Sequence, residues 1–218
     1  MFKNLLNLLL QNNCPICQHS TQNQICQYCA KQLQSCQLQN PKALWKKPLP
    51  VFAWGSYGGT LKRAIAVMKY ENHPEIGRLL GQYLGEIWLL NCTSENKKSV
   101  IVPIPLHSKK LKERGFNQAE LIARGFCETT GLKLKAKGLT RIKDTKAQFS
   151  VSGTEREQNL ADAFALGSDF KRPHPDTQVL LVDDIYTTGA TVKSAIHTLN
   201  QNNINVLGVA TIAVTAKT

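Results

Sequence analysis

The segment that decides the fold reads Val179-Leu180-Leu181-Val182-Asp183-Asp184-Ile185-Tyr186-Thr187-Thr188-Gly189-Ala190-Thr191. Its four apolar residues predict a buried strand over 178–183 that ends on two adjacent carboxylates. A hydroxyl-rich loop with one glycine follows and opens a helix predicted over 190–202. Glycine lets a phosphate approach the backbone, and the helix N-terminus offers free N–H groups to it. The loop Thr187, Thr188, Gly189, Ala190 and Thr191 is therefore a predicted monophosphate site.

The two carboxylates, Asp183 and Asp184, need a different partner from the phosphate. Because like charges repel, we expect them to contact something one step away, such as ribose hydroxyls or a metal ion. The alternative is an ordinary strand-to-helix turn in which the threonines only cap the helix.

The rest of the chain from Val51 alternates apolar strands with helical stretches. Strands are predicted over 51–57, 99–104, 178–183 and 205–215, and helices over 58–70, 74–90, 117–130 and 190–202. Such alternation predicts an α/β domain with a mostly parallel sheet, whose ligands bind beyond the carboxyl ends of the strands. With 218 residues, the chain has room for one such domain and a smaller appendage.

Positive charge is concentrated in one part of the chain. The net charge is +12, and residues 97–147 alone hold thirteen basic and four acidic side chains, while residues 1–50 hold five lysines and no acid. This distribution favours an anionic partner, either a phosphorylated metabolite or a nucleic acid. An ordinary solvated lysine-rich surface is the alternative.

Four of the seven cysteines form two C-x-x-C pairs, Cys14 with Cys17 and Cys26 with Cys29. Two such pairs supply the four thiolates that a structural zinc ion requires. Disulfides or redox-active thiols are the alternative, but an odd number of cysteines in a chain without a signal peptide disfavours them. Cys36 is the nearest spare ligand, and His19 is either a substitute ligand or simply an exposed side chain. So short a segment has little core of its own, and its folding is expected to depend on the metal.

The first twelve residues contain leucines that resemble a signal peptide, but Asn4 and Asn7 interrupt the apolar run. The pattern predicts a short amphipathic helix instead. No apolar run is long enough to span a membrane, and we expect a cytoplasmic protein.

The Val179–Thr191 segment resembles the phosphoribosyl-pyrophosphate (PRPP) signature of type I phosphoribosyltransferases. The resemblance extends over nearly the whole chain to the ComF family of competence-associated proteins, which includes GntX-like members. It is carried by the four cysteines, Val102-Pro-Ile-Pro105, Arg114-Gly-Phe-Asn-Gln118, and then by Arg141, Thr145, Gln148, Arg156, Asn159 and Phe164. The family takes part in DNA uptake during natural transformation.

The resemblance implies a role for each matching residue. Asp183 and Asp184 would hold the ribose hydroxyls of PRPP, and Thr187 to Thr191 its 5-phosphate. The segment 106–114 would be the pyrophosphate loop, and Mg²⁺ together with this basic loop would stabilise the charge on the leaving group. The stretch 141–159 would be the mobile loop that closes over the ligand. The residues concerned are Lys109, Lys110 and Arg114 in the pyrophosphate loop, and Arg141, Gln148, Arg156 and Asn159 in the mobile loop.

The domain organisation expected from this resemblance has three parts: a helix and double-zinc-ribbon-like module over 1–46, a hood over 47–98 that recognises the acceptor base, and a core domain over 99–218. Tyr57, Lys62, Lys69 and Tyr70 in the hood are candidates to contact the base, or else packing residues. The resemblance also implies a helicase-like competence partner and recombination-mediator proteins. Domains of this kind often dimerise, so a homodimer is an alternative to a monomer.

The sequence is compatible with three functions. The first is a Mg²⁺-dependent phosphoribosyltransferase with an unidentified acceptor. The second is a non-catalytic adaptor that binds single-stranded DNA or a nucleotide, and the third is a regulator that senses PRPP without turnover.

Overall fold

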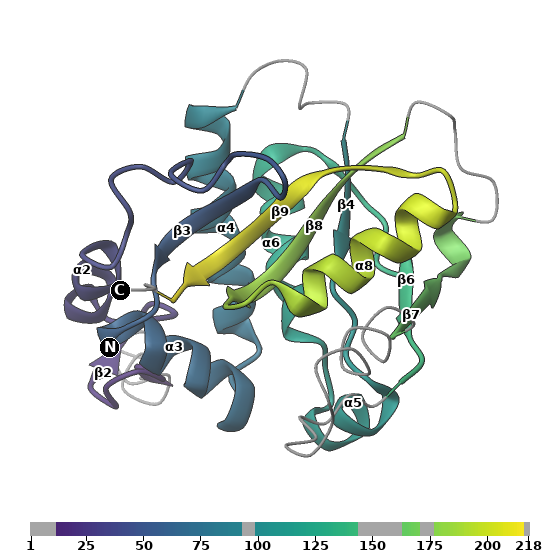
Figure 1. The fold of residues 1–218 in the computed structure, drawn as a ribbon. Helices are drawn as coiled ribbons and strands as arrows, with labels where there is room; N and C mark the ends of the chain where they lie inside the picture. Colours follow the sequence, from purple (N-terminus) through teal and green to yellow (C-terminus); the bar gives the residue numbers. More distant parts are fainter. Residues whose placement is uncertain (1–11, 93–98, 144–162, 171–176, 216–218) are drawn as a thin grey trace.

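The computed structural model describes residues 12–92, 99–143, 163–170 and 177–215 (Figure 1). Within these residues the chain folds around a five-stranded sheet with the order β3-β9-β8-β4-β5. All neighbouring strands are parallel, which confirms the predicted α/β class. The strands are β3 (Val51–Ser56), β4 (Val100–Pro103), β5 (Lys133–Leu134), β8 (Gln178–Tyr186) and β9 (Asn205–Val214).

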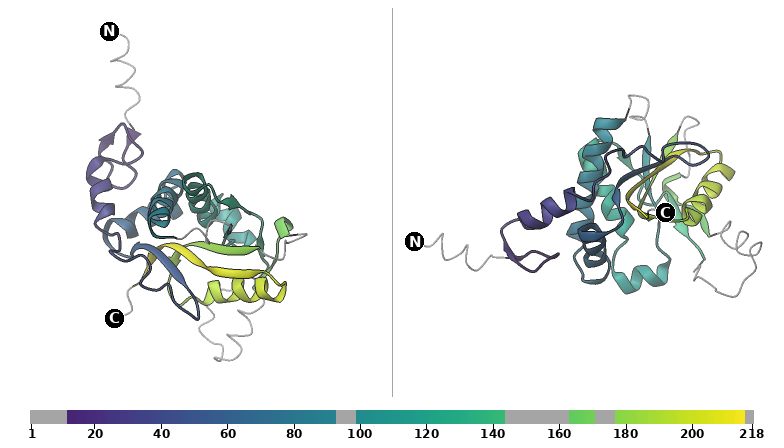
Figure 2. Two further views of the ribbon diagram at one scale, coloured as in Figure 1. Left: turned by 90° about the horizontal axis from the view of Figure 1, so that it is seen from above. Right: turned by 60° about the vertical axis from the view of Figure 1, so that its left-hand side comes forward.

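Helices cover both faces of this sheet (Figure 2). On one face α4 (Glu75–Asn91) and α6 (Gln118–Thr130) pack side by side, with α3 (Gly59–Tyr70) next to α4, and α8 (Ala190–Gln201) covers the other face. Alternate residues of β8 enter the two cores: Leu180 and Val182 join the α4 and α6 side, whereas Leu181 packs with α8. Burial on both faces explains why β8 contains the uninterrupted apolar run 179–182.

Glycines allow α4 and α6 to approach closely. A Cβ at Gly81 of α4 would lie 2.1 Å from the carbonyl oxygen of Ile122, and a Cβ at Gly125 of α6 would lie 2.1 Å from that of Arg78. Only hydrogen fits in these two positions, so the backbones of the two helices are in direct contact.

The N-terminal module is attached to the domain through its apolar residues. It contains β1 (Asn12–Asn13), β2 (Ser20–Thr21) and α2 (Gln27–Gln34). Ile16, Ile25 and Leu33 belong to the same hydrophobic cluster as Phe52 and Trp54 of β3. The module therefore shares one core with the domain.

Two observed elements differ from the predictions. Strand β8 continues to Tyr186, because Ile185 and Tyr186 still pair with β9, so the two aspartates lie within the strand. Residues 108–114, expected as a loop, form helix α5 (Ser108–Arg114), which is capped by His107 at its start and by Gly115 with φ 83° at its end. Strand β3, predicted over 51–57, hydrogen-bonds along β9 in the main sheet.

The expected mobile loop begins in regular structure. Arg141 ends β6 (Leu139–Arg141), which pairs antiparallel with β7 (Phe164–Leu166) before a short 3₁₀ turn (Ser168–Phe170). Gln148, Arg156 and Asn159 lie outside the described residues, as does most of the helix expected over the first twelve residues. None of the helices in the described part of the chain is long and apolar enough to cross a membrane.

Candidate functional site

The predicted phosphate loop lies at the carboxyl end of β8 and opens helix α8. Gly189 caps this helix with φ 73°, a left-handed conformation that favours glycine, and a Cβ there would lie 2.5 Å from the Tyr186 hydroxyl oxygen. The Ala190 N–H donates to Thr188 Oγ1 at 3.4 Å. All five predicted loop residues, together with Asp183, line one pocket, so the structure brings them together.

The two adjacent aspartates point in different directions. Successive side chains of a strand alternate between its faces. Asp183 lines the pocket, whereas Asp184 forms an ion pair with Lys69 of α3 and accepts a hydrogen bond from Gln118 Nε2 at 3.3 Å. Burial, followed by the neighbouring charge of Asp184, raises the pKa of Asp183 well above its ordinary value. Of the two aspartates, Asp183 is the one that lines the pocket with the predicted phosphate loop.

Asp184 belongs to a polar network that sequence reasoning did not find. Gln118 also accepts a hydrogen bond from Arg114 through its side-chain oxygen. The Arg114 guanidinium carbon lies 5.6 Å from the centre of the Tyr70 ring. The Arg-Gly-Phe-Asn-Gln segment carried part of the family resemblance, but sequence spacing alone does not reveal that Gln118 contacts a residue 66 positions away.

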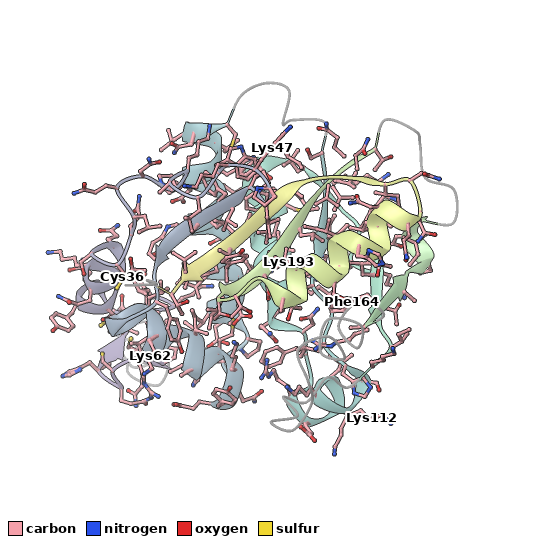
Figure 3. All side chains as sticks on the ribbon, in the orientation of Figure 1. Cys36, Lys47, Lys62, Lys112, Phe164 and Lys193 are labelled. Atoms are coloured by element: carbon pink, nitrogen blue, oxygen red, sulfur yellow. The ribbon has the colours of Figure 1, made fainter. Side chains whose placement is uncertain are left out.

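Helix α5 carries the basic side chains predicted to bind pyrophosphate. Lys109, Lys110 and Lys112 are exposed on it, and Lys112 is labelled in Figure 3. The segment before α5 is fixed to the sheet, because the Ile104 N–H donates to Val182 O at 2.9 Å and Asn117 Nδ2 donates to Ile104 O at 3.1 Å. In Figure 1, α5, α3 and the end of β8 lie along the same edge of the sheet.

Arg141, the one described residue of the predicted mobile-loop set, has a structural contact. Its guanidinium carbon lies 5.6 Å from the centre of the Phe164 ring on the paired strand β7. The structure does not bring Arg141 into the pocket lined by the phosphate loop.

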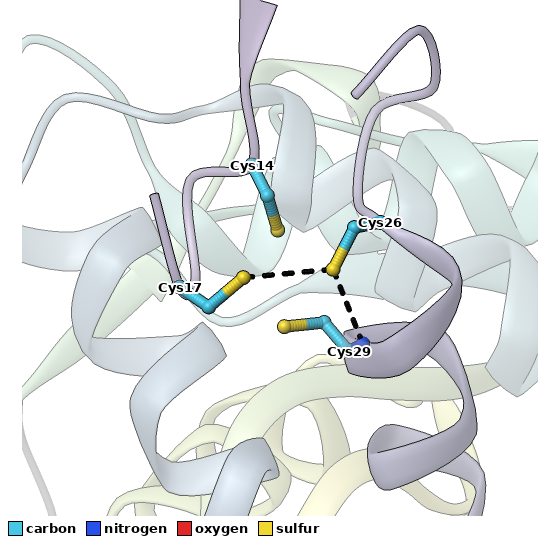
Figure 4. A group of neighbouring side chains, drawn as sticks. All are labelled: Cys14, Cys17, Cys26 and Cys29. Atoms are coloured by element: carbon cyan, nitrogen blue, oxygen red, sulfur yellow. Dashed lines mark hydrogen bonds between the residues drawn. The ribbon is translucent and has the colours of Figure 1, made fainter. Parts of the chain in front are cut away.

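The four predicted metal ligands converge at one point (Figure 4). The Sγ atoms of Cys14, Cys17, Cys26 and Cys29 all lie within 4.8 Å of one another, and no disulfide joins them. A tetrahedral zinc ion with Zn–S bonds of about 2.3 Å needs sulfurs about 3.8 Å apart. The Cys17 and Cys26 sulfurs are 3.5 Å apart, so the cluster could hold such a metal. Among the residues searched, Cys36 and His19 are not part of it.

Local electrostatics already favour a thiolate at one of these positions. Burial raises the pKa of Cys14, but hydrogen bonds from the backbone N–H groups of Cys26, Cys17 and Ile16 outweigh it and lower this pKa to about 7. Burial raises the pKa of Cys29, and the neighbouring thiols add to this increase.

Comparison with known proteins identifies the family. No protein-family profile matches the chain. Competence protein F of Haemophilus influenzae is 30% identical over 189 residues, which cover 84% of this chain and 80% of that protein. The chain belongs to the competence protein F family. This confirms the ComF resemblance.

Other relatives of this ComF-family protein carry related names. The DNA utilization protein YhgH of Salmonella typhimurium is 29% identical over 81% of this chain and 73% of that protein. Competence protein ComFC of Bacillus subtilis is 26% identical over 64% of this chain and 53% of that protein.

Solved structures similar to this ComF-family protein include two phosphoribosyltransferases. A hypoxanthine phosphoribosyltransferase from Staphylococcus aureus has a TM-score of 0.39 and 16% identity, covering 63% of this chain and 62% of that chain. An adenine phosphoribosyltransferase from Leishmania donovani has a TM-score of 0.41 and 11% identity, covering 69% of this chain and 56% of that chain. This chain thus spans less than two thirds of each of those structures.

Proposed function

We propose that this ComF-family protein binds PRPP at the carboxyl edge of its sheet and takes part in DNA uptake during natural transformation. The observation that carries the proposal is the pocket in which the Thr187–Thr191 loop, the start of α8 and the Asp183 carboxylate meet. A phosphate fits the backbone N–H groups at the start of α8, and a ribose hydroxyl fits Asp183. The names of the relatives support the role in DNA uptake.

The basic helix α5 supplies the second half of a PRPP site. Its lysines and Arg114 follow β4, the strand next to β8 in the sheet, so they lie at the same edge of the sheet as the proposed phosphate pocket (Figure 1). In phosphoribosyl transfer, negative charge gathers on the departing pyrophosphate while the anomeric carbon becomes cationic. Fixed cations on α5 would stabilise the leaving group, and Asp183 would orient the ribose.

Magnesium would be held with the ligand at the Asp183 carboxylate, an oxygen donor of the kind that Mg²⁺ prefers. When bound, it would neutralise part of the pyrophosphate charge. The four cysteines would hold a structural zinc ion that completes the N-terminal module.

Calorimetric titration of PRPP with Mg²⁺ tests the proposal. Wild-type protein should bind, whereas Asp183→Asn should bind at least tenfold more weakly because the carboxylate at the pocket is lost. The control is Asp169→Asn, a change of the same type at a residue outside the pocket. Absence of binding by the wild type would reject the proposal.

Catalysis is tested separately, by detecting pyrophosphate released from PRPP in the presence of a panel of bases. Release that depends on one base would establish a phosphoribosyltransferase and identify its acceptor. Binding of PRPP without release would favour the regulatory alternative.

Single-stranded DNA binding is a second candidate function, favoured by one surface. Tyr70 is 76% exposed beside Arg114, the last residue of α5, and the same helix carries exposed lysines. Proteins that bind single strands combine cations for the backbone with aromatic rings on which bases stack.

Fluorescence anisotropy with a labelled oligonucleotide tests this second function. The logarithm of affinity should fall with the logarithm of salt concentration, with a slope of about −0.7 per phosphate contacted. Tyr70→Ala should weaken binding by about 1–3 kcal/mol if a base stacks on the ring. A measured affinity that does not vary with salt would exclude this function.

A further inference from the structure

Gln118, the first residue of α6, links the acidic and basic parts of the proposed site. It is only 6% exposed, and both ends of its amide are used: the oxygen accepts from Arg114, and the nitrogen donates to Asp184. A side-chain amide accepts through its oxygen and donates through its nitrogen without carrying charge. Neither a carboxylate nor an apolar side chain would satisfy both neighbours.

The contacts continue from each neighbour to α3 and close a ring. Asp184 pairs with Lys69, whose side chain is 14% exposed, while Arg114 lies over the ring of the next residue, Tyr70. The ring joins α3, β8, α6 and α5. Because Gln118, Asp184 and Lys69 are largely withdrawn from water, their mutual orientation is more strongly determined than that of exposed side chains.

The two cations in this ring of contacts, Lys69 and Arg114, differ in whether an acidic side chain neutralises them. Lys69 compensates Asp184, whereas Arg114 is held by a neutral amide and an aromatic ring. Among the residues that the structure describes, no ion pair joins Arg114 to a carboxylate. Arg114 is thus held in place while its full charge stays available to an anion.

We propose that Gln118 is a positioning residue, which holds the Arg114 guanidinium at the end of α5 without neutralising it and thereby sets the affinity of this helix for a pyrophosphate group. The inference rests on the proposed function, because it assigns the pyrophosphate to α5. A glutamate at this position would pair with Arg114 and repel Asp184. A leucine would release Arg114 from its position.

The test measures two probes by calorimetry: inorganic pyrophosphate for α5 and ribose 5-phosphate for the threonine loop. Gln118→Glu should weaken pyrophosphate binding about tenfold and make it less dependent on ionic strength, because one cation is neutralised. Gln118→Leu should weaken it several-fold and leave the salt dependence unchanged. Ribose 5-phosphate affinity should stay within twofold in both variants.

Gln178→Glu is the matched control, since it adds the same charge at the exposed amino end of β8, away from the ring. It should leave both affinities unchanged. The melting temperature of each variant establishes that it is folded, and Gln118→Leu provides the answer if Gln118→Glu unfolds.

Two results would overturn this inference and leave the proposed function standing. One is wild-type pyrophosphate affinity in both Gln118 variants, and the other is an equal loss for both probes, which would indicate a purely structural role. If the wild type binds neither probe, the proposed function fails and the inference fails with it.

Discussion

At the scale of single residues, the two adjacent aspartates have unequal roles. Asp184 is buried against Lys69, so Asp184→Asn leaves an unpaired buried ammonium. Breaking a buried ion pair from one side typically costs about 3–5 kcal/mol. We expect this loss in the free energy of unfolding measured with urea, and a much smaller loss for Asp183→Asn. Equal losses in the two variants would contradict the assignment.

The raised pKa of Asp183 also predicts a pH dependence. In the unfolded chain an aspartate ionises at a pKa of about 3.9, whereas burial and the charge of Asp184 keep Asp183 protonated to higher pH in the folded state. The folded state then binds more protons, so the stabilisation that this proton provides is lost as pH rises from about 4 through the raised pKa.

The variant Asp183→Asn isolates this effect, because asparagine does not titrate. Urea denaturation of both proteins over this pH range should show that the free energy of unfolding of the variant improves relative to wild type as pH rises. The cysteines titrate in both proteins, so their contribution cancels in the difference between the two free energies of unfolding. A difference that is constant with pH would show that the pKa of Asp183 is not raised.

Gly189 gives a further prediction at this scale. A non-glycine residue in the left-handed conformation costs about 1–2 kcal/mol, and at Gly189 a Cβ would also meet the Tyr186 hydroxyl. Gly131 has the same φ of 73° but open space around it, so Gly131→Ala is the matched control. Gly189→Ala should lower the melting temperature more than Gly131→Ala, and PRPP binding should weaken only in the former.

At the scale of elements, the contact between α4 and α6 determines how the helices cover the sheet. Gly81→Ala would place a Cβ 2.1 Å from the Ile122 carbonyl oxygen, so the helices must separate. Overpacking of this kind typically costs about 1–3 kcal/mol, which urea denaturation measures. Gly58→Ala, where a Cβ would meet no atom within 4 Å, should cost little. Comparable losses in the two variants would argue against the close packing.

The elements were predicted unequally well. The long strands and helices, such as β3, α4 and β9, follow from strong apolar patterns and were found within one or two residues. Helix α5 was expected as a loop, because seven mostly charged residues carry no apolar face to reveal a helix. The sequence features that could have indicated this helix are its capping residues, His107 and Gly115. Strand β8 is longer than predicted because pairing with β9 extends it past the aspartates.

At the scale of the whole molecule, the shared core couples the N-terminal module to the α/β domain. Since Ile16, Ile25 and Leu33 belong to the same cluster as Phe52 and Trp54, loss of the metal should destabilise more than the N-terminal segment. A strong chelator should release one zinc ion per chain, lower the melting temperature of the domain and change tryptophan fluorescence.

Two cysteine variants separate the metal effect from loss of a thiol. Cys17→Ser should abolish zinc binding, because it removes one of the four clustered sulfurs. Cys36→Ser should retain one zinc ion per chain by metal analysis, since Cys36 lies outside the cluster. Zinc content far below one per chain in the wild type would count against the site.

The sequence by itself determined the parallel α/β architecture, the Thr187–Thr191 loop that opens α8 and the four converging cysteines. These features depend on residues close together in the chain, whose spacing directly fixes local geometry. Only the tertiary structure decided that Asp183 faces the pocket while Asp184 pairs with Lys69, and that Gln118 joins Asp184 to Arg114. Those contacts depend on how four elements pack around the edge of the sheet. The spacing of residues in the sequence does not specify that packing.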